Sequence, residues 1–303
     1  RARLPKKSGG VLRERIELRY RAVLQGPVAL AIGRRCTLLG VSRSGFYAWC
    51  QRPSSPRAAE NADLLRAMWE IHRTVDRSYG SPRMPAELAA RGLACGRNRA
   101  ARVMRAGGLR AKQARAFVVT TDSQHRLPVA ENLVQQEFTA AAPNRLWMSD
   151  VTYIATDAGW AFLAVVLDAF ARRVVGWALG PQLTADLVQA ALQQALMGRT
   201  PAAGAIHHSD RGSVYASHSY RALLATSGLR CSMSRAGNCY DNAVVESFFR
   251  TLKVERVYDR RYVSLDAAQA DLAQYIEVFY NRVRRHSTLG YVSPVVYELQ
   301  RVA

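Results

Sequence analysis

Residues 147–179 read WMSDVTYIATDAGWAFLAVVLDAFARRVVGWAL, a stretch rich in Val, Ile, Trp and Tyr. Such residues favour extended chain, because their branched or aromatic side chains pack well on a pleated surface. The stretch predicts three consecutive strands, over 147–155, 161–167 and 174–179. The intervening segments Asp157-Ala158-Gly159 and Ala171-Arg172-Arg173 are short enough to be turns.

The chain after this stretch alternates between helical and extended patterns. We expect helices over 184–197, 217–227, 241–257 and 264–282, and strands over 205–208 and 229–233. Three strands followed by helix, strand, helix, strand and helix form a mixed α/β core. The predicted fold class is therefore α/β, with a ribonuclease-H-like mixed sheet as the catalytic core.

Three acidic residues lie at informative places in this core. Asp150 is inside the first strand, where a buried charge is costly unless it is paired or binds a metal. Asp210 follows the strand 205–208, and the carboxyl ends of strands in α/β sheets are where sites collect. Glu246 lies within the helix 241–257, where taken alone it is explained by a weak pair with Arg250 four residues on.

The helix that carries Glu246 has two distinct faces. At 100° per residue, its apolar residues form one stripe, made of Val244, Val245, Phe248, Phe249 and Leu252. The opposite stripe is polar and contains Asn242, Glu246, Arg250 and Lys253. We expect Glu246 to face a metal site and Asn242, Arg250 and Lys253 to contact DNA. Asp241 is predicted to be the N-cap of this helix.

Three carboxylates on separate elements are typical of metal-dependent phosphoryl transfer. Two Mg²⁺ ions about 3.5–4 Å apart neutralise the anionic transition state and align the reacting oxygens. Mg²⁺ prefers hard oxygen ligands, and Mn²⁺ can substitute for it. We therefore predict that Asp150, Asp210 and Glu246 are both the catalytic residues and the ligands of two metal ions.

The positive charge of the chain is concentrated near its amino end. The net charge is +20, and residues 1–115 carry 25 of the 43 basic but 7 of the 23 acidic residues. Such a field attracts polyanions, of which nucleic acid is the usual one. Within this region a helix, a Gly-containing turn and a basic helix predict a helix-turn-helix, with an ordinary helical hairpin as the alternative. The DNA-binding candidates here are Arg43, Arg97, Arg99, Arg102 and Arg105.

These patterns divide the chain into five predicted parts. They are a basic segment at 1–27, a helix-turn-helix-like unit at 28–57, a second, DNA-binding unit of this kind at 58–115, a linker at 116–143, and the catalytic domain with its basic C-terminal helix and tail at 144–303. No membrane span or signal peptide is visible, and the irregular cysteines argue against a zinc site. We expect a cytoplasmic, nucleoid-associated protein.

Other polar residues receive structural interpretations. Asp168, at the end of the second strand, is expected to serve a turn or cap. His207 and His208 precede Asp210 and are equally well explained as structural histidines or as groups that position a phosphate. His286, in the basic tail, is expected to be solvated.

Several motifs together resemble a known family. Thirty-five residues separate Asp210 from Glu246, which resembles the DDE signature of integrases and related transposases. The words YGSPR at 79–83, HHSDRG at 207–212, SMSRAGNCYDNA at 232–243, ESFF at 246–249 and YNRVRRHS at 280–287 are similar to OrfB-type DDE transposases of bacterial insertion sequences, the insertion-sequence-three family, with an integrase catalytic core. The resemblance covers roughly residues 28–298.

The resemblance implies an activity and partners. Such proteins cleave the 3′ ends of their element at its terminal inverted repeats, and join these ends to target DNA through the freed 3′-hydroxyl. They act as homo-oligomers on paired ends, and many are fused by frameshifting to an upstream DNA-binding segment. The chain begins with Arg1, and we expect it to be part of such a longer product. The alternatives are a DNA-binding regulator with an inactive nuclease-like core and an RNase-H-type nuclease.

Overall fold

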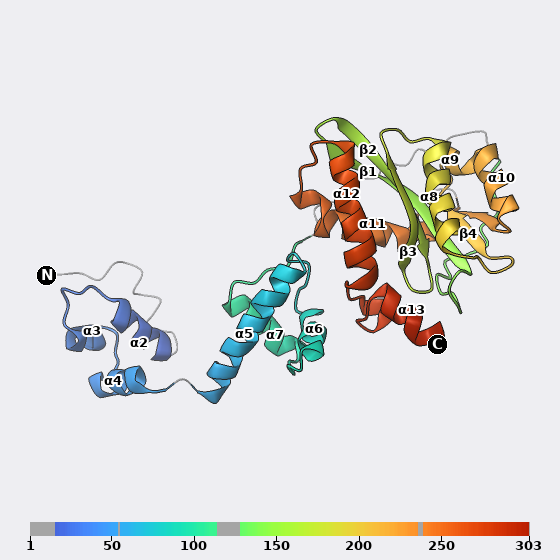
Figure 1. Ribbon diagram of the computed structural model, residues 1–303. Helices are drawn as coiled ribbons and strands as arrows, with labels where there is room; N and C mark the ends of the chain where they lie inside the picture. Colours follow the sequence, from blue (N-terminus) through green and yellow to red (C-terminus); the bar gives the residue numbers. More distant parts are fainter. Residues whose placement is uncertain (1–15, 54, 114–127, 236–238, 303) are drawn as a thin grey trace. The chain divides into compact units, whose positions relative to one another are not determined.

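The computed structural model describes residues 16–53, 55–113, 128–235 and 239–302 (Figure 1). The chain divides into two compact units, Arg1–Asp63 and Leu64–Ala303, and each is described by itself. None of the described helices is long and apolar enough to cross a membrane.

The first unit contains three short helices, α2 (Ile16–Gln25), α3 (Ile32–Leu38) and α4 (Arg43–Gln51). Its core consists of Tyr20, Val23, Cys36, Leu39 and Phe46. Ser42 is the N-cap of α4, and its side chain accepts a hydrogen bond from the backbone nitrogen of Gly45 at 3.0 Å.

The second unit opens with a helical region of three elements. These are α5 (Pro56–Thr74), whose first residues belong to the first unit, α6 (Met84–Ala90) and α7 (Arg97–Ala106). Val103 and Met104 of α7 are buried against Met68 and Leu88, as their apolar spacing predicts. Their burial leaves the arginine-rich side of α7 toward solvent.

Five strands form one sheet in the order β3-β2-β1-β4-β5. The strands are β1 (Leu146–Thr156), β2 (Gly159–Asp168), β3 (Arg173–Gly180), β4 (Ile206–Ser209) and β5 (Arg230–Met233). β1, β2 and β3 pair antiparallel, whereas β4 pairs parallel with both β1 and β5. This arrangement confirms the predicted ribonuclease-H-like mixed sheet, with every predicted strand present.

Helices cover both faces of the sheet (Figure 1). Because side chains alternate along a strand, Trp147 and Met148 enter different cores. Trp147 packs with α8 (Ala185–Gly198) and α10 (His218–Thr226), and Met148 with α11 (Ala243–Glu255) and α12 (Leu265–Ala273). α8 lies so close to β3 that a Cβ on Gly176 would be 2.2 Å from the backbone oxygen of Ala191. Only glycine permits this approach.

The C-terminal part differs from its predicted outline. The helix expected over 264–282 is α12 followed by a π-helical segment, η3 (Gln274–Tyr280), and the sequence gives no periodic signal for that change. The helix expected over 241–257 is α11 with short 3₁₀ turns on either side, η1 (Cys239–Asn242) and η2 (Val257–Asp259). Three further elements were not predicted: α9 (Ser213–Ala216), η4 (Ser287–Leu289) and α13 (Pro294–Val302).

Candidate active site

The parallel pairing of β1 and β4 brings Asp150 and Asp210 together. Ser149 of β1 pairs with Ser209 of β4, and each serine is followed by one of the two aspartates. Asp150 continues along β1, whereas Asp210 is the first residue after β4. The two acids therefore lie next to each other at the end of β4. The Asp150 carboxylate accepts a hydrogen bond from the backbone nitrogen of Val151 at 2.8 Å.

A tight turn after β4 holds the Asp210 carboxylate. Its Oδ1 accepts a hydrogen bond from the backbone nitrogen of Gly212 at 2.9 Å. A Cβ on Gly212 would lie 3.0 Å from this same oxygen, which is closer than ordinary contact. Arg211 donates to the backbone oxygen of Ser234 at 2.6 Å and so ties the turn to the chain after β5.

α11 brings Glu246 to the same region. Its apolar stripe is buried as predicted, with Val245 and Leu252 fully inaccessible, while Glu246 on the other face is exposed. Asn242, just before the helix, donates from Nδ2 to the backbone oxygen of Ser149 at 3.3 Å. The start of α11 is thereby attached to β1 one residue before Asp150.

The three acids influence each other electrostatically. Burial raises the pKa of Asp150 well above its usual value, and the charges of Asp210 and Glu246 raise it further. Burial and then Asp210 likewise raise the pKa of Glu246. A divalent cation between the acids would stabilise their charged forms, and their carboxylate oxygens are the donors that Mg²⁺ prefers.

The metal site is not complete in this geometry. Over the parts of the chain that the structure describes, no three His, Cys, Asp or Glu side chains are arranged so that they could hold a metal ion as they stand. Glu246 is exposed on its helix, whereas Asp150 and Asp210 are held by the backbone bonds described above. The chemistry of the donors fits a divalent metal.

Two cations follow Glu246 on α11. Arg250 is exposed, and no ion pair with Glu246 is found among the described residues. The Lys253 ammonium lies over the ring of Tyr153, 4.5 Å from its centroid. Burial lowers the pKa of Lys253 and the charge of Asp150 opposes this shift, so Lys253 lies near the acids.

The two histidines before Asp210 are structural. His207 Nε2 lies 2.8 Å from Ser149 Oγ and 3.0 Å from the Tyr220 hydroxyl. His208 Nδ1 lies 2.8 Å from Ser232 Oγ, so both imidazoles hold neighbouring strands and α10 together. Burial lowers the pKa of His207 to about 3 and that of His208 to about 4, and both rings are therefore neutral at pH 7.

Asp241 is not the N-cap of α11, contrary to the prediction. Its carboxylate is fully buried and binds the Arg235 guanidinium through Nε at 3.0 Å and Nη2 at 2.9 Å. Asn132 also donates to it, at 2.9 Å. The pKa of Asp241 is held well below its usual range by Arg235. Residue 242 occupies the cap position instead, because η1 precedes the helix.

Two further structural interpretations have opposite outcomes. Asp168 serves a turn as predicted, accepting hydrogen bonds from the backbone nitrogens of Asn144 at 2.7 Å and Phe170 at 2.9 Å. His286 was expected to be solvated, and that prediction is wrong. It is 8% exposed and its ring stacks edge-on against Tyr280 at 4.8 Å.

Tyr215 is a residue near the site that the sequence analysis missed. Its hydroxyl is buried, and none of the described residues hydrogen-bonds to it. Burial raises its pKa, and Tyr220, Asp150 and Asp210 raise it further, which places the hydroxyl near both aspartates. The available signal was its position five residues after Asp210, but a short helix such as α9 has no recognisable periodicity.

The basic candidates near the amino end lie on two separate units. Arg43 is the first residue of α4 and is exposed, with its guanidinium 5.8 Å from the centroid of the Tyr47 ring. The other four candidates lie on α7, where Arg97, Arg102 and Arg105 are exposed and Arg99 is half-buried.

Comparisons with known proteins agree with this geometry. A model of the integrase core domain matches residues 140–239, a second integrase core model matches residues 227–294, and an HTH-like domain model matches residues 59–117.

The chain is 46% identical to an uncharacterized 31 kDa protein of insertion element IS600 from Shigella sonnei, over 86% of this chain and 96% of that protein. It is 41% identical to transposase InsF for insertion sequence IS3A from Escherichia coli K12, over 94% of this chain and 100% of that protein. The simian T-cell lymphotropic virus intasome structure gives a TM-score of 0.45 at 18% identity, over 76% of this chain and 74% of that one, which is too distant to carry an argument.

Proposed function

Since this chain belongs to the IS3 family of insertion-sequence transposases, we propose that Asp150, Asp210 and Glu246 are its catalytic residues and hold two Mg²⁺ ions. The protein is a DDE-type phosphoryl-transfer enzyme of DNA transposition, and its integrase core family uses divalent metals. The regulator and RNase-H-type nuclease alternatives are therefore set aside. The observation that supports the residue assignment is the pairing of Ser149 with Ser209, which brings Asp150 beside Asp210.

Each of the three acids is positioned by a different structural element. Asp150 extends from the central strand of the sheet, Asp210 from the turn held by Gly212, and Glu246 from α11. When bound, the metal ions would neutralise the phosphate and activate the attacking hydroxyl. The chain itself would orient the DNA phosphate, with Lys253 offsetting the repulsion between that phosphate and the acids.

DNA is the proposed partner at two levels. α7 would enter the major groove at the terminal inverted repeats, because it is the basic helix that follows α6 within the matched HTH-like domain. Arg250 and Lys253 would contact the end being cleaved, and Arg43 the DNA outside α7. We further propose that the protein acts as a homo-oligomer on paired ends and joins them to target DNA in the cytoplasm.

The test is an Asp210→Asn variant assayed on labelled element-end DNA with Mg²⁺. It keeps the volume of the side chain and removes a metal ligand. We expect cleavage and strand transfer to fall by orders of magnitude while DNA affinity is retained. The matched control is Asp266→Asn, which makes the same charge change at an exposed position in the first turn of α12. Normal joining by Asp210→Asn would refute the assignment.

A further inference from the structure

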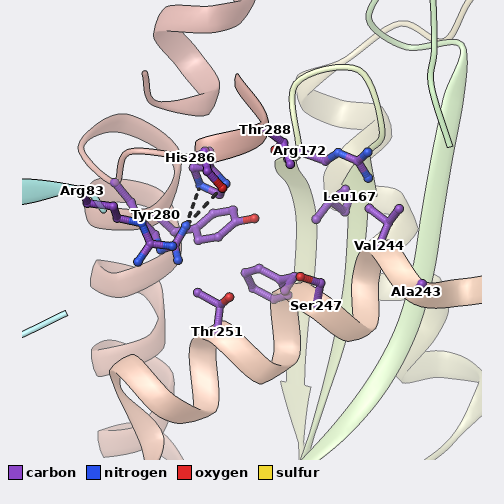
Figure 2. A pocket seen from close by; sticks show the side chains of 13 residues that line it. Arg83, Leu167, Arg172, Ala243, Val244, Ser247, Thr251, Tyr280, His286 and Thr288 are labelled. Carbon is purple, nitrogen blue, oxygen red and sulfur yellow. Dashed lines mark hydrogen bonds between the residues drawn. The ribbon is translucent and has the colours of Figure 1, made fainter. Parts of the chain in front are cut away.

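A polar cavity lies beside α11, on a flank of the helix that does not carry Glu246. Its volume is about 270 Å³, and it lies between α11, η3 and the segment that follows η3 (Figure 2). Ser247 and Thr251 line it from α11, one helical turn apart, and His286 and Tyr280 line it from the other side. Val244 and Phe248 of the apolar stripe line it as well, so the cavity lies on the side of α11 that is turned toward the sheet and η3.

Positive charge predominates in this cavity. Three arginines line it, Arg83, Arg172 and Arg284, and Glu255 is the acid that pairs with two of them. Glu255 is itself 5% exposed and binds Arg284 through a two-bond fork at 2.7 and 2.8 Å. Arg83 reaches the same carboxylate at 3.3 Å. One carboxylate thus pairs with two of the three guanidinium groups.

Arg172 is the cation that this pairing leaves out. It lies in the turn between β2 and β3 and donates to the backbone oxygen of Phe138 at 3.4 Å. Among the described residues it has no carboxylate within ion-pair distance. Figure 2 shows its side chain at the side of the cavity nearest Leu167 and Val244. Its φ of 56° is unusual for a residue other than glycine.

His286 is kept neutral by these arginines. Burial lowers its pKa far below the usual value, and the charges of Arg284, Arg83 and Arg172 lower it further. Arg284 Nη1 lies 3.3 Å from His286 Nε2, so the third guanidinium nitrogen that Glu255 does not bind is directed at the ring. A neutral ring among three cations indicates a cavity whose field favours an anion.

We propose that this cavity binds one backbone phosphate of the DNA on which the protein acts. Arg172 and Arg83 would supply charge, and Ser247 and Thr251 hydroxyl donors. The volume exceeds that of a phosphate group and admits part of the adjoining sugar, which favours a strand over a free anion. The proposal rests on the proposed function and adds a second point at which the strand is held.

The test uses the full chain without divalent metal, so that binding is measured without cleavage. Element-end DNA is prepared as a set in which each phosphate in turn is replaced by a neutral methylphosphonate. Wild-type protein should lose about tenfold in affinity when one particular phosphate is replaced, the scale of a charge-assisted hydrogen bond. Arg172→Gln should lose about tenfold on natural DNA and show no further loss at that position.

Two other variants complete the design. Thr251→Met fills the cavity without changing its charge. As for Arg172→Gln, the DNA affinity of this variant should not fall further when that phosphate is replaced by methylphosphonate. Arg230→Gln removes an exposed arginine from β5, away from the cavity, and should keep the wild-type pattern. Identical methylphosphonate profiles for wild type, Arg172→Gln and Thr251→Met would overturn the proposal. A second result would also overturn it: inorganic phosphate binds in the cavity, but no methylphosphonate position changes the DNA affinity. The ligand of the cavity would then be a free anion.

This outcome is separate from that of the Asp210→Asn test. If Asp210→Asn cleaves normally, the catalytic assignment fails while the methylphosphonate profile still reports on the cavity. If the profile is unchanged but Asp210→Asn is inactive, the cavity proposal fails alone.

Discussion

Asn242 Nδ2 donates to the backbone oxygen of Ser149 across 3.3 Å, and this bond joins the start of α11 to the strand residue before Asp150. The bond therefore links α11, which carries Glu246, to β1, which carries Asp150. The side-chain oxygen of Asn242 is buried and has no hydrogen-bond partner among the residues that the structure describes. Asn242 was selected as a DNA contact from the sequence, and its burial also gives it a positioning role that can be tested.

We predict that Asn242→Ala separates catalysis from DNA binding. Loss of the bond should cost about 1–3 kcal/mol of stability, because the Ser149 carbonyl loses its side-chain donor. Cleavage should fall more than DNA affinity, since Glu246 is no longer fixed relative to Asp150. Gel-shift and cleavage assays on the same DNA give the two numbers. Equal losses in both would favour a direct DNA contact instead.

We predict that Gly212→Ala weakens metal binding without unfolding the protein. The backbone of Gly212 has a φ of −57° that alanine adopts freely, but the new Cβ would crowd Asp210 Oδ1 at 3.0 Å. The Mg²⁺ concentration for half-maximal cleavage should rise about tenfold, equal to about 1.4 kcal/mol. Gly198→Ala is the control, because a Cβ there meets nothing within 4 Å. An unchanged Mg²⁺ requirement would show that Asp210 can move freely.

We predict that Lys253→Ala impairs 3′ processing and end binding while the melting temperature stays almost unchanged. The ammonium lies over Tyr153, a contact worth about 0.5–1 kcal/mol at an exposed site. Lys253→Arg keeps the charge and should retain most activity. A variant that processes ends normally but melts markedly lower would identify Lys253 as a structural residue.

We predict a pH-dependent stability that originates in the acid cluster. The pKa values of Asp150 and Glu246 are raised in the folded protein, so their stabilising contribution is complete below the unfolded pKa of about 4 and is lost as pH rises through the folded pKa. Without metal, Asp150→Asn should therefore melt roughly 2–4 °C above wild type at pH 7. The difference should vanish near pH 4. A lower melting temperature at pH 7 would contradict the repulsion.

We predict that Arg102→Gln weakens DNA binding and reduces the salt dependence of the affinity. Loss of one phosphate contact lowers the slope of log K against log salt by about 1. The affinity should be measured with the full chain, because hydrogen bonds join the helical region to the catalytic part. Arg285 donates to Glu87 at 2.6 Å, and Lys112 donates to the backbone oxygen of Glu255 at 2.7 Å. Arg91→Gln is the control, since Arg91 pairs with Glu70 at 3.4 Å. An unchanged slope for Arg102→Gln would exclude a phosphate contact.

The sequence by itself determined the strands, most helices and the two faces of α11. These features follow from local periodicity, which depends on which neighbouring residues are apolar. One example is the alternation of Trp147 and Met148 between two cores. Another is the burial of Val245 and Leu252 opposite Glu246. The proposal of the three acids as the catalytic residues also comes from the sequence and stays a prediction, because it depends on their positions within elements and on a spacing that resembles a family.

Only the tertiary structure decided which polar residues are buried and with what partner. Asp241 was read as a helix cap, yet it binds Asn132, which is 109 residues away in the chain. His286 was read as solvated, yet Arg83 and Arg172, from distant elements, surround it. Ion pairs and cavities depend on segments that meet only after folding, and no pattern within a short window specifies those meetings.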